Sequence, residues 1–138
     1  MLINLRKHIE DVSNENIYSF QFDIPDVRFS VNQYVHVNEI CLNWSDQRGS
    51  EKYFNGRLDS TLVDKSPINP YQQLLYFQHI QDSNFMLFTP THLQKYKIQR
   101  TSLQSAEFKL TLSRRVKLED FCLQLEISDG PSRLQQIR

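Results

Sequence analysis

The sequence predicts an all-β fold: an antiparallel β-sandwich of about eight strands with at most one short helix. Three observations predict this fold class. Apolar and polar residues alternate in many short segments, helical periodicity is almost absent, and turn-forming residues separate the segments. The length of 138 residues favours two packed sheets over a small five-stranded barrel. The Greek-key sandwich and the jelly roll both fit this pattern.

The chain has the size of a single domain. Its composition, 39% hydrophobic and 23% charged, is that of an ordinary globular protein. A chain of this length buries about two thirds of its unfolded surface, so folding requires neither a disulfide framework nor a metal ion. We assign residues 1–131 to one β-sandwich domain and residues 132–138 to a short C-terminal tail.

Alternation predicts several strands in the first third of the chain. The apolar residues of the opening segment, 3–9, largely share one parity. Tyr18–Ile24 alternates without a fault, Pro25-Asp26 interrupts the pattern, and Val27–Val31 alternates again. Since neighbouring side chains of a strand point to opposite faces, each segment should place one face on the core and the other in water.

Residues 34–44 form the longest strand candidate, and its parity changes midway. Val35 and Val37 occupy odd positions, whereas Ile40, Leu42 and Trp44 occupy even positions. This pattern predicts either a strand covered on both faces or a strand that bends in the middle.

The second half of the chain repeats the alternation. It contains five further strand candidates: Arg57–Val63, Phe85–Phe88, Tyr96–Gln99, Phe108–Leu112 and Phe121–Ile127. Each is short and ends at polar or turn-forming residues.

Two other segments are read from local signals. Asn55-Gly56 is the strongest short turn signal in the chain. Residues 70–80 fit a helix that begins at a proline, and they fit a loop followed by a strand equally well.

Charge and cysteine content indicate the compartment and the class of partner. The 16 basic and 16 acidic residues give zero net charge, which argues against a general polyanion binder or a charge-held membrane protein. No stretch approaches the roughly 18 apolar residues of a spanning helix, and the opening lacks the order of a secretory signal. Two cysteines 81 residues apart indicate free thiols, so we expect an intracellular protein of the cytoplasm or nucleus.

We find no signature of catalysis. The four histidines, at positions 8, 36, 79 and 92, form no metal-ligand spacing with each other or with cysteines and carboxylates. The three glycines build no phosphate loop, and no nucleophile has a local partner. We therefore expect a non-enzymatic protein without a metal or cofactor.

One segment departs from the flat charge average. Residues 93–117 carry a local charge of +6, and the candidates for a basic strip are Lys95, Lys97, Arg100, Arg114, Arg115 and Lys117. Such a strip could meet phosphates or an acidic protein, although lysines of this kind also keep strands soluble. Aromatic residues do not interleave with these charges, so we expect no specific nucleic-acid contact.

Amide and aromatic residues favour binding over catalysis. About one residue in six is Gln or Asn, which provides hydrogen bonds for wide, partly wet interfaces. Four aromatic residues near predicted loops are the best candidates for exposed interface anchors: Tyr53, Phe54, Tyr71 and Tyr76. A sugar-binding surface would use the same residue types.

Five segments carry a family resemblance: Phe20–Pro25, Tyr34–Ile40, Asn69–Tyr71, Phe108–Leu112 and Phe121–Ile127. With them the chain resembles the single jelly-roll proteins of icosahedral virus capsids. It is similar in particular to the minor, penton-type capsid proteins of polinton-like and related DNA viruses and virophages. The resemblance covers nearly the whole chain as an architecture, without a diagnostic motif, and it transfers no functional residue.

The resemblance implies a jelly roll that functions by assembly in a virion. Copies would form a homo-oligomer, a pentamer or a trimer, and would contact other capsid proteins. The long basic arm with which some small capsid proteins hold nucleic acid is missing, so genome binding is not implied. The alternative function is a non-catalytic binding module, either a carbohydrate-binding or a TNF-like β-sandwich.

Overall fold

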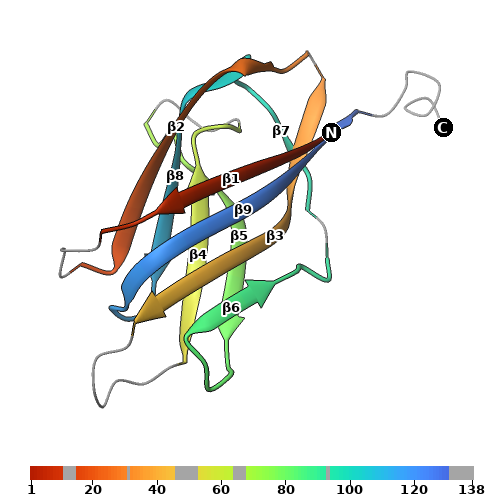
Figure 1. Cartoon of the computed structure of the whole chain (residues 1–138). Helices are drawn as coiled ribbons and strands as arrows, with labels where there is room; N and C mark the ends of the chain where they lie inside the picture. Colours follow the sequence, from red (N-terminus) through yellow and green to blue (C-terminus); the bar gives the residue numbers. More distant parts are fainter. Residues whose placement is uncertain (11–14, 31, 46–52, 64–67, 93, 131–138) are drawn as a thin grey trace.

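Nine strands form two antiparallel sheets that pack face to face (Figure 1). The computed structural model describes residues 1–10, 15–30, 32–45, 53–63, 68–92 and 94–130, and within these ranges it contains no helix. The strands are β1 (Leu2–His8), β2 (Ile17–Arg28), β3 (Gln33–Ser45), β4 (Phe54–Ser60), β5 (Gln72–His79), β6 (Phe85–Phe88), β7 (Tyr96–Lys97), β8 (Ser102–Leu112) and β9 (Lys117–Asp129).

The strand order is that of a jelly roll. The front sheet has the order β1-β9-β3-β6, with β7 also paired to β3, and the rear sheet has the order β2-β8-β4-β5. The first strand therefore pairs with the last, β2 with β8, β3 with β6 and β7, and β4 with β5. This nested pairing, divided between two sheets, is the jelly-roll topology. The predicted antiparallel sandwich is confirmed.

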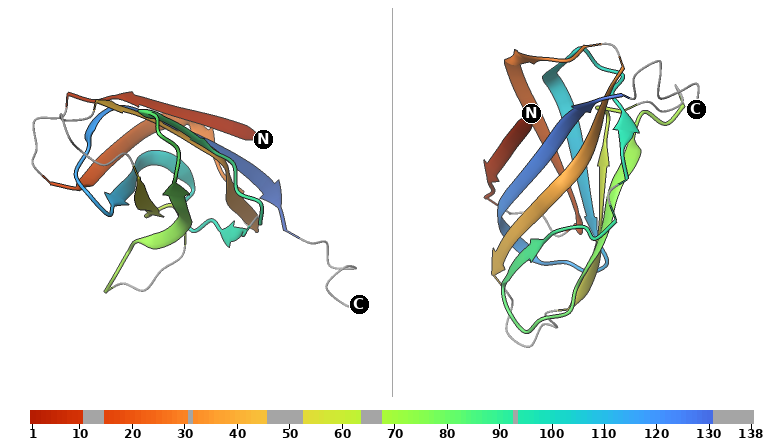
Figure 2. Two further views of the ribbon diagram at one scale, coloured as in Figure 1. Left: turned by 90° about the horizontal axis from the view of Figure 1, so that it is seen from below. Right: turned by 90° about the vertical axis from the view of Figure 1, so that its right-hand side faces the viewer.

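Side-chain contacts between the two sheets show which strand of the front sheet packs on which strand of the rear sheet. Three pairs cross the interior, Phe121 with Phe20, Trp44 with Phe54, and Phe88 with Phe77, and the exposed Lys7 reaches over Phe22 at the edge. As a result β1 lies over β2 and β6 lies over β5. The edge strands β1 and β2 therefore share one side of the sandwich, and β5 and β6 share the other (Figure 2).

The core follows the predicted alternation. In β8 and β9 every second residue is buried, from Phe108 to Leu112 and from Phe121 to Ile127. Each fully buried Leu or Phe side chain contributes about 1.5–3 kcal/mol relative to its exposed state. Ring stacking adds to this burial, since the centroids of Phe20 and Phe121 lie 4.3 Å apart.

β3 keeps its large apolar residues on one face by means of a bulge. Val37 pairs with Leu125 and Glu39 pairs with Gln124, so Asn38 is an extra residue without a partner in the ladder. The extra residue reverses the parity of the strand and lets both halves bury their apolar residues. Of the two predicted alternatives for residues 34–44, the bend is therefore correct.

The interruption predicted at Pro25-Asp26 disturbs the pairing but does not end the strand. β2 continues from Ile17 to Arg28 through Pro25, with a register shift between Ile24 and Arg28. β2 is an edge strand, where a missing N–H group and a bulge break no essential ladder bond.

The turn predicted at Asn55-Gly56 is wrong. Both residues lie inside β4, which begins at Phe54, and Gly56 pairs with Phe77. The Phe77 ring occupies the space where a side chain at position 56 would stand, so this glycine serves close packing.

Residues 70–80 were predicted to form either a helix or a loop followed by a strand. The strand is correct, because Gln72–His79 form β5. The register of β5 against β4 shifts between Leu75 and Gln73, which leaves Leu74 as an extra residue. The tail predicted for residues 132–138 lies outside the described residues.

Candidate functional site

The histidines lie apart and pair individually. His8 and His36 approach carboxylates of β9, at 3.1 Å from Asp120 and 3.2 Å from Glu126. His79 hydrogen-bonds the carbonyl of Ser83 at 3.1 Å. Across the residues that the structure describes, no three His, Cys, Asp or Glu side chains come together in a group that could hold a metal ion.

The structure separates the predicted basic strip into two groups. Lys97 lies opposite Tyr34 at the start of β3, whereas Lys117 lies opposite Ser45 at its end. At about 3.3 Å per residue, the two ends of β3 are roughly 35 Å apart. Lys95 lies with the first group, and Arg114 and Arg115 lie with the second.

The arginines of the predicted strip hydrogen-bond nearby strands and loops of their own chain. Arg100 donates to Thr61 Oγ1 and to the carbonyl of Gln104. Arg114 donates to the carbonyl of Tyr53, and Arg115 donates to the hydroxyl of Tyr18. These contacts tie the arginines to their own chain, and the structure does not bring the six predicted residues together.

The predicted aromatic anchors divide in the same way. Tyr53 and Tyr76 are exposed, at 54% and 53%. Phe54 is buried against Trp44, with ring centroids 5.0 Å apart, so its prediction as an exposed anchor is wrong. Phe54 begins a strand and points inward, whereas the prediction relied on its position near a predicted loop.

Tyr71 is partly buried and held by two contacts. Its hydroxyl donates to the Glu107 carboxylate, and the ammonium of Lys109 lies 4.5 Å from its ring centroid. The bond to Glu107 is the main reason why the pKa of Tyr71 is raised above its ordinary value of 10.0. Tyr71 is therefore fixed to its own sheet.

Exposed apolar side chains mark the edges of the sandwich. Within strands, the large exposed hydrophobic residues are Leu2 of β1, Ile17 of β2, Tyr76 of β5, and Phe85 and Leu87 of β6. All four of these strands are edge strands. The inner strands β9, β3, β8 and β4, described in full, expose no side chain of this kind.

We define two surfaces from these residues. The first edge surface is the side of β1 and β2, where Leu2 is exposed at the start of β1 and Ile17 at the start of β2. The second comprises Tyr76, Phe85, Leu87 and Ile80, which directly follows β5 and is 75% exposed. Each surface belongs to edge strands whose outer backbone groups pair with no further strand in the described part of the chain, which makes both sides suited to contact with another chain.

A cleft of about 290 Å³ opens beside the second edge surface. It lies where the outer part of the front sheet is interrupted, between Phe88 of β6 and Tyr96 of β7. Its apolar lining residues are Val37, Leu74, Leu75, Phe88, Pro90 and Tyr96, and its polar ones include Gln73, His92 and Gln94. An apolar lining with amides beside it suits an apolar side chain of a partner chain.

A wider groove of about 460 Å³ lies on the outer face of the rear sheet. Tyr76 lines it together with Asn55, Arg57 and Gln73. Arg57 also approaches Asp59 at 3.1 Å, so the groove combines one aromatic ring with several hydrogen-bonding groups.

Sequence reasoning found Tyr76 but missed the apolar residues of β6. A signal was present, because Phe85–Phe88 is a run of four apolar residues. A strand covered on one face buries only every second residue, so such a run in an edge strand exposes the others.

A scan against protein-family models and a search of curated proteins both gave no match. No helix in the described part of the chain is long and apolar enough to cross a membrane.

Proposed function

We propose that this chain is a structural subunit, of the single jelly-roll capsid type, that associates head to tail with further copies of itself. One observation carries the proposal: each of the edge strands β1, β2, β5 and β6 exposes at least one large apolar side chain, and the inner strands expose none. The first edge surface of one copy would contact the second edge surface of the next. Such a contact between two different surfaces closes into a ring when the rotation between copies allows it.

Charge and shape support this arrangement. The chain has zero net charge, so copies do not repel one another. The cleft beside the second edge surface offers space for an apolar side chain of a neighbour, such as Ile17 or Leu2. A stable contact of this kind buries more than about 1,000 Å². A pentamer or a trimer fits the proposal, and other capsid proteins form a second class of partner.

Light scattering coupled to size exclusion, followed by negative-stain imaging, tests the proposal on the full chain. We expect a mass that rises with concentration to a fixed multiple of 16.5 kDa, and rings in the images. Leu87→Lys should weaken association at least thirtyfold, since a central contact contributes about 2 kcal/mol or more. Gln104→Lys, on the exposed side of inner strand β8, is the matched control and should assemble normally.

A monomer of 16.5 kDa at every concentration would refute self-association. In that case the groove around Tyr76 favours a second function, carbohydrate binding, because sugars stack on half-exposed aromatic rings and bind amide and guanidinium groups. A glycan array with wild type and Tyr76→Ala tests this function. Hits that disappear in the variant would support it, and an array without hits would exclude it.

A further inference from the structure

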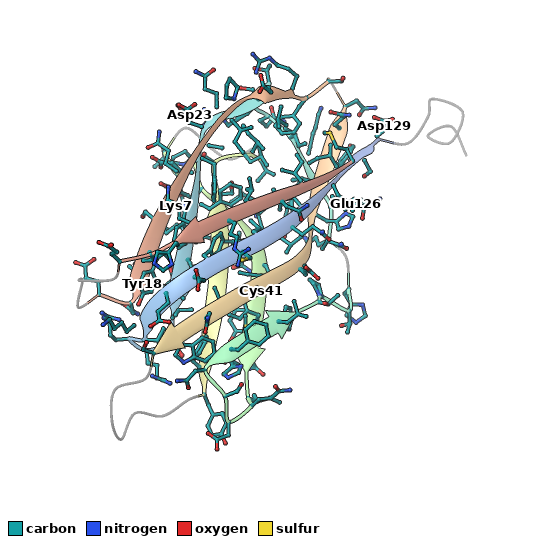
Figure 3. The ribbon with its side chains drawn as sticks, viewed as in Figure 1. Lys7, Tyr18, Asp23, Cys41, Glu126 and Asp129 are labelled. Carbon is teal, nitrogen blue, oxygen red and sulfur yellow. The ribbon has the colours of Figure 1, made fainter. Side chains whose placement is uncertain are left out.

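Cys41 and Cys122 are far apart in the sequence but direct neighbours in the front sheet. In the antiparallel pairing of β3 with β9, Cys41 stands opposite Cys122. The residues that flank Cys41, Ile40 and Leu42, are buried in the core, and so are those that flank Cys122. Both thiols therefore lie on the outer face of the sheet, where both are free and partly exposed. Figure 3 labels Cys41 in this sheet.

The pairing gives the two cysteines the spacing of a disulfide. Residues directly opposite in antiparallel strands have Cα atoms about 4.5 or 5.5 Å apart. Disulfides bridge Cα distances of about 4.4–6.8 Å. Rotation of the two side chains is therefore sufficient to form the bond, without displacement of either strand.

Small molecules have access to this pair. A hollow of about 200 Å³ is lined by both cysteines, and Arg6 and Glu39 also line it. Burial raises the pKa of Cys41, Cys122 and Glu39 raise it further, and Arg6 lowers it. Because the thiolate is the reactive form, Cys41 should react slowly at neutral pH and faster at alkaline pH.

We propose that Cys41 and Cys122 form a dithiol site that a peroxide oxidises to a cross-strand disulfide within one chain. One thiolate attacks a peroxide oxygen, the O–O bond breaks, and the leaving hydroxide takes a proton to become water. The second thiol then attacks the resulting sulfenic sulfur, the S–O bond breaks, and a second water leaves. In sum, hydrogen peroxide is reduced to two waters and two thiols are oxidised to one disulfide.

The disulfide would tie β3 to β9 and enclose the chain from β4 to β8 between the linked residues. Because the enclosed segment is long, oxidation should raise the Tm by on the order of 10 °C. This site does not depend on the proposed self-association.

Intact-mass spectrometry of the full chain, before and after one equivalent of hydrogen peroxide, tests the proposal. We expect the loss of two hydrogens, both thiols inaccessible to alkylation, and a proteolytic peptide that joins residues 41 and 122. Cys41→Ser should abolish this product. The double variant Cys122→Ser with Gln124→Cys is the matched control. It keeps two cysteines, at positions 41 and 124, on the same face of the sheet, but as diagonal neighbours whose Cα atoms are about 7–8 Å apart.

Three results would overturn the proposal. They are sulfinic acid on separate cysteines, disulfides only between chains on a non-reducing gel, and a displaced pair that closes as readily as the native pair. Slower oxidation of Arg6→Gln would support the role of Arg6 in favouring the thiolate.

Discussion

At the scale of single residues, Gly56 shows how much one missing side chain contributes. It lies inside β4 opposite Phe77, and a Cβ atom there would stand 2.2 Å from the Cζ of that ring. Since the obstacle is a buried ring and not the end of a flexible side chain, the structure would have to shift to admit a methyl group. This packing explains a glycine in the interior of a strand.

Gly56→Ala should therefore destabilise the fold by about 1–3 kcal/mol, the usual cost of overpacking. Urea denaturation followed by circular dichroism measures the change in the free energy of unfolding. The double variant Gly56→Ala with Phe77→Leu should lose less than the sum of the two single variants, because the smaller side chain leaves room for the methyl group. Strict additivity would show that the ring is not the obstacle.

Tyr71 predicts a loss of stability at high pH. Its pKa is raised above 10.0, chiefly because its hydroxyl donates to the Glu107 carboxylate. The unfolded chain thus loses this proton first, near pH 10, so stability that is fully present below pH 10 is lost as the pH rises through the folded pKa. Glu107→Gln should lower the pKa of Tyr71 toward 10 in an ultraviolet absorbance titration. An unchanged titration curve would contradict this cause.

At the scale of elements, the bulge in β3 makes the strand sensitive to its length. Without Asn38, one half of the strand must turn its core residues to the outer face. Exposure of Val35 and Val37 alone costs about 3–6 kcal/mol, which is comparable with the whole stability of a small domain.

We therefore expect deletion of Asn38 to abolish cooperative thermal unfolding. Asn38→Ala, which keeps the residue count, should cost only about 1 kcal/mol for the lost hydrogen bond to Gln124. Differential scanning calorimetry distinguishes the two variants. Equal transitions would mean that the register can slip without cost.

Alternation predicted β2, β3, β8 and β9 because each of these strands places one face on the core. The errors arose where a neighbouring strand decides the outcome. In the sequence, Asn55-Gly56 is a turn signal. Only the pairing of Gly56 with Phe77 explains the glycine as a position of close packing. The extra residue Leu74 sets two leucines side by side in β5, which gives residues 70–80 an apolar spacing that a helix also shows.

The candidate site was less predictable than the fold, because it depends on strand order. No local pattern shows that Phe85 and Leu87 lie on an edge strand. The same limit applies to Cys41 and Cys122, which only the register of β3 and β9 brings together. Tyr76 was predicted as an exposed aromatic residue because it lies near a predicted loop, and it is exposed on β5.

At the scale of the whole molecule, the nested pairing of the jelly roll leaves edge strands on both sides of the described sandwich, β1 and β2 on one and β5, β6 and β7 on the other. A chain with only one apolar side would form a dimer by joining two identical surfaces. With apolar residues on both sides, a head-to-tail contact leaves one free surface at each end, so association continues until a ring closes. The two arrangements respond differently when one side is blocked.

Mixing two blocked variants distinguishes these arrangements. Leu87→Lys blocks the second edge surface and Ile17→Lys blocks the first, so in head-to-tail assembly each variant alone should be a monomer. Mixed in equal amounts they should form a dimer and nothing larger, because the one compatible contact joins the intact first surface of Leu87→Lys to the intact second surface of Ile17→Lys. Light scattering measures the mass, and the double variant is the control that should not join either partner.

Association through identical surfaces would give a different result. If identical surfaces met, through the second edge surface of two copies, Ile17→Lys would dimerise alone and adding Leu87→Lys would not increase the mass. A dimer that forms only in the mixture requires two different surfaces on one chain, and therefore requires both sides of the sandwich to function as interfaces.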